Sequence, residues 1–188
     1  YAMKKYIQAA KSAFTEDERE ETSFFINIET ITGYANFDKM LELPEAKDLA
    51  GIVFGRADMT GSMGLSKEDV NSDTIFEMAN CLAVKTLNHG KKLIIGGGVS
   101  IDSLPFFRKL PENSLYKFET RKIIFDAQKI LTDKTPEKGI LKAIGFELMW
   151  LKNKRDFYKM IYNEDAQRLI MLENCYKSLM EKTEEVYA

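Results

Sequence analysis

The sequence predicts an α/β protein: a partial TIM (β/α)8-type barrel followed by a helical extension. Short apolar runs alternate with amphipathic helical patterns about four times, with predicted strands ~20–40 residues apart, which is typical of parallel α/β folds. The second run, Gly51-Ile52-Val53-Phe54-Gly55, is nearly all apolar, as strands of a parallel sheet tend to be. A complete barrel needs ~250 residues. About four parallel βα units would therefore make half of one.

The individual elements follow from apolar spacing and from helix-stop signals. Strands are predicted over residues 23–29, 51–57, 93–95 and 115–119. Helices are predicted over residues 2–14, 72–88 and 121–131, where apolar residues recur every three or four positions. Shorter helices are expected over residues 37–41 and 104–107, and the acidic run 16–21 is expected to be a solvated loop. We therefore assign residues 1–132 to the barrel-like part.

The last third of the chain is predicted to be a helical hairpin, residues 133–188. Thr135-Pro136 has the residue types of an N-cap followed by the first helical position. The first helix is expected to end near Tyr162, and Asn163-Glu164-Asp165 is expected to start the second. The apolar stripes of both helices are typical of core or subunit-interface positions, so we expect a homo-oligomer.

Composition and the start of the chain restrict the kind of protein. Net charge is −2, so no nucleic-acid partner is expected, and no apolar run reaches the ~18–20 residues that span a bilayer. Cys81 and Cys175 form no disulfide framework, which predicts a cytoplasmic protein with reduced thiols. The chain begins at Tyr1 directly in a helical pattern, so we expect a fragment that holds the C-terminal half of the barrel.

Two acids follow the first two predicted strands. Glu29 ends the first apolar run and Asp58 follows the second by three residues. The carboxyl ends of barrel strands carry the chemistry of such enzymes, and a carboxylate buried there needs a positive partner. Oxygen ligands without histidine or thiol suit Mg²⁺ or Mn²⁺. The alternative is that each acid forms a separate salt bridge at the rim.

Glycine-rich segments follow the second and third strands. In Gly55-Arg56-Ala57-Asp58-Met59 and the residues up to Gly64, small side chains would let backbone N–H groups approach a substrate carboxylate or oxyanion. Arg56 would add a charged contact, or else pair with a neighbouring acid. Gly96-Gly97-Gly98 could cradle a phosphate, although close packing of the strand end is the simpler expectation. His89 precedes a strand, on the face away from catalysis, and is expected to be structural.

The motifs Ile26-Asn27-Ile28-Glu29-Thr30 and Gly55-Arg56-Ala57-Asp58-Met59 resemble those of the HpcH/HpaI aldolase and citrate lyase beta-subunit family, over roughly residues 1–125. The resemblance implies a (β/α)8 barrel and metal-dependent making or breaking of carbon–carbon bonds in 2-oxo acids or acyl-CoA esters. It implies that Glu29 and Asp58 bind Mg²⁺ or Mn²⁺. It also implies that the substrate is a small molecule held around Gly55, Arg56, Ala57 and Met59. The residue that performs the catalytic step is not identified.

Two other functions remain open from the sequence. One is a phosphate-binding barrel enzyme centred on Gly96–Gly98, which would bind an anion without contact to Glu29. The other is a non-catalytic assembly protein, a half barrel that associates through its helical hairpin. Half a barrel leaves two sheet edges exposed, which favours either a second copy or a longer chain.

Overall fold

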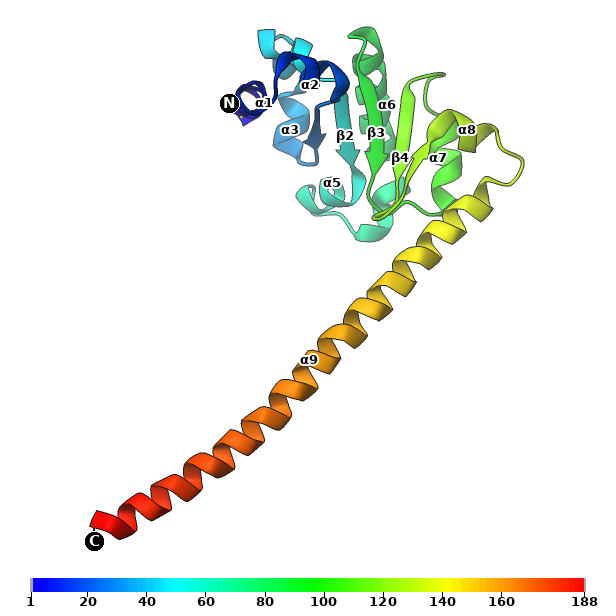
Figure 1. The fold of residues 1–188 in the computed structure, drawn as a ribbon. Coiled ribbons are helices and arrows are strands. Elements are labelled where there is room, and N and C mark those ends of the chain that lie inside the picture. The colour runs from blue at the N-terminus through cyan, green and yellow to red at the C-terminus, as the bar shows by residue number, and fades with distance from the viewer. Residues whose placement is uncertain (1, 188) are drawn as a thin grey trace. The chain divides into compact units, whose positions relative to one another are not determined.

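The computed structural model describes residues 2–187, with side chains described as far as residue 182. It shows an α/β fold around one five-stranded sheet in the order β1-β2-β3-β4-β5 (Figure 1). The strands are β1 (Phe25–Ile28), β2 (Gly51–Gly55), β3 (Lys92–Gly96), β4 (Leu115–Glu119) and β5 (Ile124–Asp126). β1 to β4 pair in parallel, and β5 pairs antiparallel with β4. The predicted α/β class is confirmed at this level.

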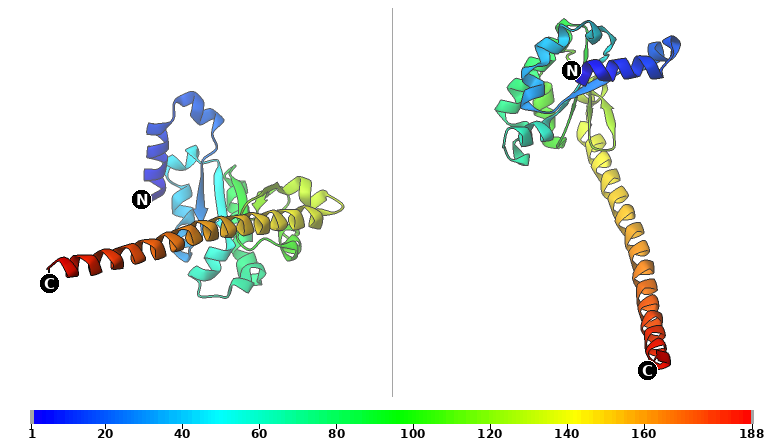
Figure 2. Two further views of the ribbon diagram at one scale, coloured as in Figure 1. Left: turned by 60° about the horizontal axis from the view of Figure 1, so that its bottom comes forward. Right: turned by 90° about the vertical axis from the view of Figure 1, so that its left-hand side faces the viewer.

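Helices connect each pair of parallel strands. α3 (Ile31–Ala35), α4 (Phe37–Leu41) and η1 (Pro44–Asp48) lead from β1 to β2. α5 (Arg56–Ser62), η2 (Lys67–Asn71) and α6 (Asp73–Asn88) lead from β2 to β3, and η3 (Ile101–Ser103) and α7 (Leu104–Arg108) lead to β4. Because sequential strands are also neighbours, each connection adds one strand in the same direction across the sheet. Figure 2 shows the same arrangement from two further sides.

The main core lies between the sheet and these helices. Alternate strand residues supply one side of it: Ile28, Ile52, Phe54, Leu93, Ile95 and Phe118. α6 supplies the other side with Ile75, Ala79, Leu82 and Ala83, which recur at helical spacing on one face. Phe118 stacks on Phe107 and Phe125, with ring centroids 4.8 and 5.0 Å apart. The opposite face of the strands carries a row made of Asn27, Val53, Ile94 and Lys117, which pair in this order across β1 to β4.

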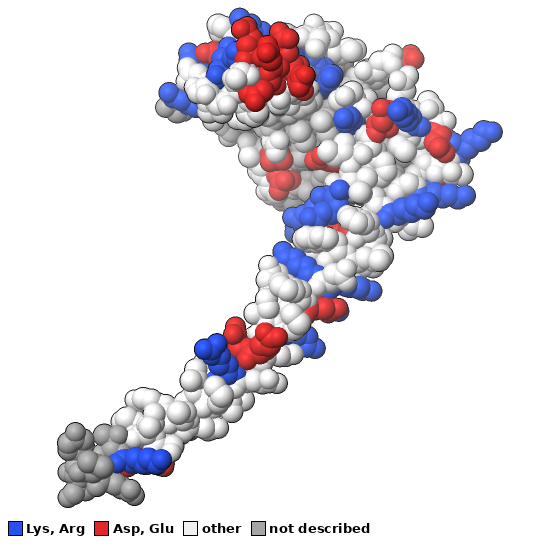
Figure 3. Space-filling model, viewed as in Figure 1, with Lys and Arg blue, Asp and Glu red and all other residues white. Residues whose placement is uncertain are grey.

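The N-terminal residues form two helices beside β1. α1 (Ala2–Ala13) buries Met3 and Ile7 in a second apolar cluster with Ala46 and Leu49. The acidic run predicted as a loop is a short helix, α2 (Glu16–Glu21), and Figure 3 shows acidic side chains gathered in this region. The loop prediction was wrong because Thr15 and Glu18 form a capping box, in which each side chain meets the other residue's backbone N–H.

The region after β4 departs from the predicted helix over residues 121–131. The chain turns at Thr120, which accepts from and donates to the backbone of Ile123, and returns as β5. Asp126 then caps α8 (Ala127–Thr132) through its bond to the Lys129 N–H, 2.9 Å long. The segment Ile124-Phe125-Asp126 is too short to show the alternation of a strand. The predicted helix over residues 121–131 therefore included the residues of β5.

The predicted C-terminal hairpin is instead one continuous helix, α9 (Pro136–Tyr187). Asn163-Glu164-Asp165 contains neither glycine nor proline, so it carries no strong helix-breaking residue. The chain divides into two compact units at Ile144 and Gly145 rather than near residue 132, because Ile140 and Ala143 of α9 are buried with the first unit. No helix in the described chain combines the length and apolar character needed to cross a bilayer.

Candidate metal centre at the carboxyl end of the sheet

The strand register places two acids and two glycines at one level across β1 to β4. Ile28 pairs with Phe54, and Ile95 pairs with Phe118. The next residue on each strand is, in order, Glu29, Gly55, Gly96 and Glu119, and Gly55 and Gly96 pair directly. Successive side chains of a strand point to opposite faces. These four residues therefore lie on the sheet face opposite the main core, as an acid–glycine–glycine–acid row.

The two acids lean inward over the two glycines. A Cβ added to Gly55 would lie 2.6 Å from Oε1 of Glu29, and a Cβ added to Gly96 would lie 3.1 Å from Oε1 of Glu119. Each carboxylate therefore occupies the space that a side chain of the neighbouring strand would fill. The glycines allow both negative groups to approach the middle of the sheet edge.

A third acid, Asp58, reaches the same region from α5. β2 runs directly into α5, which puts Asp58 in the first turn of that helix, with its side chain exposed. Its charge raises the pKa of Glu29, so the two carboxylates are close enough to repel each other. The two predicted ligands, Glu29 and Asp58, thus lie near enough for their charges to interact.

The electrostatics of this row favour a cation. Burial is the main cause that raises the pKa of Glu29, and the charges of Asp58 and Glu119 add to it. Asn27 acts the other way, donating from Nδ2 to Glu29 Oε1 over 2.9 Å. Burial also raises the pKa of Glu119. The salt bridges found among the described residues include none of the three acids, so the predicted alternative of separate rim salt bridges is not observed there.

The donor set fits a hard divalent ion that keeps part of its water shell. Carboxylate oxygens are the ligands that Mg²⁺ and Mn²⁺ prefer, and Mg²⁺ is usually held by one or two carboxylates plus waters and substrate oxygens. Among the described residues no group of three or more His, Cys, Asp or Glu side chains is arranged to hold a metal ion by itself. Glu29 and Asp58 are the pair that would bind such an ion, with Asn27 holding Glu29 in place.

Glu119 is the functional candidate that sequence reasoning missed. Phe118-Glu119 repeats the pattern of Ile28-Glu29, in which a buried apolar residue is followed by an acid at the end of a strand. The strand 115–119 was predicted correctly, and the acid at its end was the available signal. Arg121, two residues further along the chain, is exposed in the structure.

Arg56 lies in the core rather than beside the acids. Its side chain is fully buried, with the guanidinium 4.9 and 5.2 Å from the ring centres of Phe106 and Phe107. It donates to four neutral acceptors: the carbonyl oxygens of Gly96 and Val70, Oδ1 of Asn71 and Oγ of Ser103. Burial lowers its pKa to about 9, so it remains charged at neutral pH. Its role here is to join α5 to β3 and to the segments around η2 and η3.

The other predicted substrate-binding residues divide between core and surface. Met59 is fully buried in the main core, while Ala57 is half-buried and Gly55 lies under Glu29. Gly97 has a φ of +78°, and a Cβ there would lie 2.5 Å from the N atom of Ala57. Gly98 has a φ of +63° and would meet the Val70 side chain at 3.0 Å. Both glycines thus have a packing role, which accounts for this run without a phosphate.

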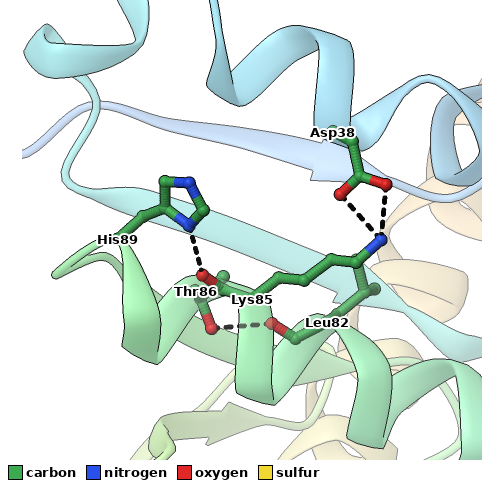
Figure 4. A network of polar contacts seen from close by, with 5 residues as sticks. All are labelled: Asp38, Leu82, Lys85, Thr86 and His89. Carbon is green, nitrogen blue, oxygen red and sulfur yellow. Dashed lines mark hydrogen bonds and ion pairs between the residues drawn. The ribbon is translucent and has the colours of Figure 1, made fainter.

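His89 lies at the far end of α6 from the acids. It follows Asn88, the last residue of α6, and its Nδ1 is 2.8 Å from the carbonyl oxygen of Lys85 (Figure 4). The side chain of Lys85 pairs with Asp38 at 2.7 Å, which connects α6 to α4. His89 thus lies at the C-terminal end of α6, just before the start of β3. That is the edge of the sheet opposite the acids.

Comparisons with known proteins add no relative from which a role could be transferred. No protein-family model matches the chain, and neither a curated protein nor a solved structure matches it.

Proposed function

We propose that this chain is part of a divalent-metal-dependent carbon–carbon lyase of the aldolase type, in which Glu29 and Asp58 bind Mg²⁺ or Mn²⁺. The observation that carries the proposal is the acid–glycine–glycine–acid row with Asp58 beside it. The charges of Asp58 and Glu119 act on Glu29 there, and none of these three acids takes part in the salt bridges found among the described residues. A bound cation would offset the burial and the neighbouring negative charges that together raise the pKa of Glu29.

The proposed fold is the C-terminal half of a (β/α)8 barrel. Its support is the sequential order of four parallel strands with helices between them and a common core on one side. In a barrel the other face of the strands is the interior, and chemistry is found at the carboxyl ends of the strands. Glu29, Glu119 and Gly96 have that position in the described sheet. The proposed family is the HpcH/HpaI aldolase and citrate lyase beta-subunit family, from the two motifs around Glu29 and Asp58.

The proposed substrate is a 2-oxo acid or an acyl-CoA ester. A bound Mg²⁺ or Mn²⁺ would stabilise the negative charge that develops on a substrate carbonyl oxygen when the adjacent carbon–carbon bond is made or broken. The chain's own residues orient this reaction. Asn27 fixes the carboxylate of Glu29, Gly55 and Gly96 leave room above the strand ends, and Glu119 lines the opposite side of that space.

The test is a calorimetric titration of Mn²⁺ and Mg²⁺ into the wild type, Glu29→Gln and Asp58→Asn. Each substitution removes one charged ligand while keeping the shape, so each should weaken binding at least about tenfold. Glu77→Gln, an exposed acid on α6, is the matched control and should bind as the wild type does. Equal affinity of the wild type and Asp58→Asn for both ions would exclude the proposed metal site.

A further inference from the structure

The long helix α9 carries a heptad repeat from Leu141 to Leu179. Apolar residues recur in two series with a period of seven, and the second series follows the first by three positions, which is the a and d pattern of a coiled coil. The a positions are Leu141, Leu148, Arg155, Tyr162, Leu169 and Tyr176. The d positions are Ile144, Leu151, Tyr158, Asp165, Leu172 and Leu179. We call this set of twelve residues the seam.

The apolar seam residues are exposed along the helix. Leu148 and Leu169, for example, are 53% and 59% exposed, and Leu172 is 50% exposed. In Figure 3 most of the visible surface of α9 is uncharged, with charged groups only at intervals. A stripe of exposed leucine and tyrosine over several helical turns marks a helix that packs against a partner. Five heptads exceed the three to four that indicate a coiled coil.

The two charged seam residues indicate what the partner is. Arg155 is at an a position and Asp165 is at a d position. In a parallel pair of identical helices, a faces a and d faces d, so Arg155 would face Arg155 and Asp165 would face Asp165. In an antiparallel pair, a faces d, which allows opposite charges to meet. Charge complementarity therefore favours an antiparallel arrangement of two copies.

We propose that α9 forms an antiparallel coiled coil with α9 of a second copy of this chain, with Arg155 of each copy facing Asp165 of the other. This register also overlaps the whole seam. Residue numbers that face each other add up to 320, which pairs 141 with 179, 148 with 172, 151 with 169, and 144 with 176. The register that buries most apolar residues is thus the one that pairs both charges.

Registers shifted by one heptad bury fewer apolar residues and do not pair the two charges. A shift in one direction places Arg155 opposite Tyr158, and a shift in the other places it opposite Leu172. Either shift leaves a charge without an opposite charge in the seam, which is costly. In the single chain Arg155 pairs with its neighbour Asp156, at 2.7 Å, with both side chains largely exposed. An exposed pair of this kind contributes little to stability, so it can be exchanged for the pair across the seam.

The test uses charge reversal in the 188-residue chain and sedimentation equilibrium. The wild type should be a dimer at micromolar concentration. Arg155→Asp and Asp165→Arg each put like charges opposite one another twice, and each should weaken the dimer at least about tenfold. Mixing the two variants one to one should restore dimers, since every facing pair is then of opposite charge. Lys177→Asp, a matched reversal at a b position outside the seam, should leave the dimer unchanged.

The alternatives give different results in the same experiment. A hairpin folded back within one chain would make the same residue pairs, but it predicts a monomeric wild type and no effect of mixing. A parallel dimer predicts that neither single reversal weakens association, while a different partner protein predicts a wild type that stays monomeric. Any of these results would overturn the proposal. Far-ultraviolet circular dichroism of each variant checks that the helix content is retained, and the double variant Arg155→Asp/Asp165→Arg should dimerise like the wild type.

Discussion

Glu29 and Glu119 show how single residues build the candidate site. Each side chain comes from the end of one strand and lies over a glycine of the neighbouring strand, Gly55 of β2 for Glu29 and Gly96 of β3 for Glu119. The arrangement needs two residue types at once: an acid whose side chain extends toward the adjacent strand, and a glycine on that strand, which has no Cβ to obstruct it. Neither glycine has a positive φ, so the backbone conformation does not require glycine at either position. The space that their missing Cβ atoms leave to the carboxylates is what the site uses.

Gly55→Ala tests this use of space. The new methyl group would lie 2.6 Å from Oε1 of Glu29 and must displace the carboxylate. Misplacing a ligand in this way should weaken Mn²⁺ binding by about 10–100-fold in a calorimetric titration. Gly61→Ala in α5 meets no atom within 4 Å, so it should bind metal normally and stabilise the helix by about 0.5–1 kcal/mol. Unchanged affinity in Gly55→Ala would mean that the position of Glu29 does not matter for binding.

The raised pKa of Glu29 predicts the pH dependence of the metal-free protein. Because the folded-state pKa lies above the usual value of 4.5, the folded state binds a proton more tightly than the unfolded state. The resulting stability is fully present below the unfolded pKa and is lost as pH rises through the folded pKa. Glu29→Gln removes this loss and should be more stable than the wild type near pH 8.

This gain is expected to stay below about 1 kcal/mol, because the side chain is only partly buried and its repulsions are screened. Urea unfolding at pH 4 and pH 8 in the presence of a chelator measures it. The difference between variant and wild type should shrink at pH 4. A Glu29→Gln variant that is less stable than the wild type at pH 8 would show that the carboxylate has a favourable partner.

At the scale of elements, much of the sheet could be predicted from the sequence. The apolar runs before Glu29, at Gly51–Gly55 and around Ile94 were sufficient, because strands buried on both faces need few polar residues. Helices that depend on local side-chain hydrogen bonds were harder to predict. The acidic run 16–21 was expected to be a loop, but the capping box of Thr15 stabilises it as α2. Contacts between distant segments were hardest to predict. The burial of Arg56, for example, depends on β3, η2, η3 and α7 meeting around one guanidinium.

Arg56 is predicted to hold the elements under the site together. Arg56→Met would keep the apolar stem but leave four acceptors, three of them in buried hydrogen bonds, without their donor. Removing the uncompensated buried charge offsets part of this loss, and the net destabilisation should be about 2–4 kcal/mol. Arg56→Lys should be destabilised similarly, since one ammonium cannot reproduce the planar fork.

Urea unfolding gives the free energy of each Arg56 variant, and Arg108→Met provides the control. Arg108 is exposed on α7, so its replacement should change stability by no more than about 0.5 kcal/mol. If Arg56→Met were as stable as Arg108→Met, the hydrogen bonds would be balanced by the cost of burying the charge. Arg56 would then be retained for a reason other than stability.

At the scale of the whole molecule, the contacts within the structure divide the chain at a later residue than the sequence pattern does. A boundary near residue 132 follows from the N-cap and first-position pair Thr135-Pro136, whereas the first turns of α9 belong to the same compact unit as the sheet. Ile140 is fully buried there, and the chain around Gly139 lies against Phe125 and Ile130. Helical periodicity predicts which apolar residues share one face of a helix. It does not predict which part of the protein covers that face.

Two shortened chains test where the first unit ends. A chain that stops after Lys152 keeps Ile140 and Ala143, and should retain its fold and its affinity for Mn²⁺ while losing most of the seam. A chain that stops after Lys134 removes both residues and exposes the apolar surface of Phe125 and Ile130. Loss of one large buried side chain alone typically costs about 2–5 kcal/mol. The shorter chain should therefore unfold at a temperature lower by roughly 5–15 °C.

Association between copies would make the unfolding temperature depend on protein concentration. Because both shortened chains lack most of the seam, the comparison between them is largely independent of this effect. Thermal unfolding followed by circular dichroism, with and without Mn²⁺, measures the difference. Similar unfolding temperatures for the two chains would place the boundary near residue 132, as predicted from the sequence. A lower temperature for the shorter chain alone, with the metal shift preserved in the longer one, would show that the site needs the start of α9 but not its remaining turns.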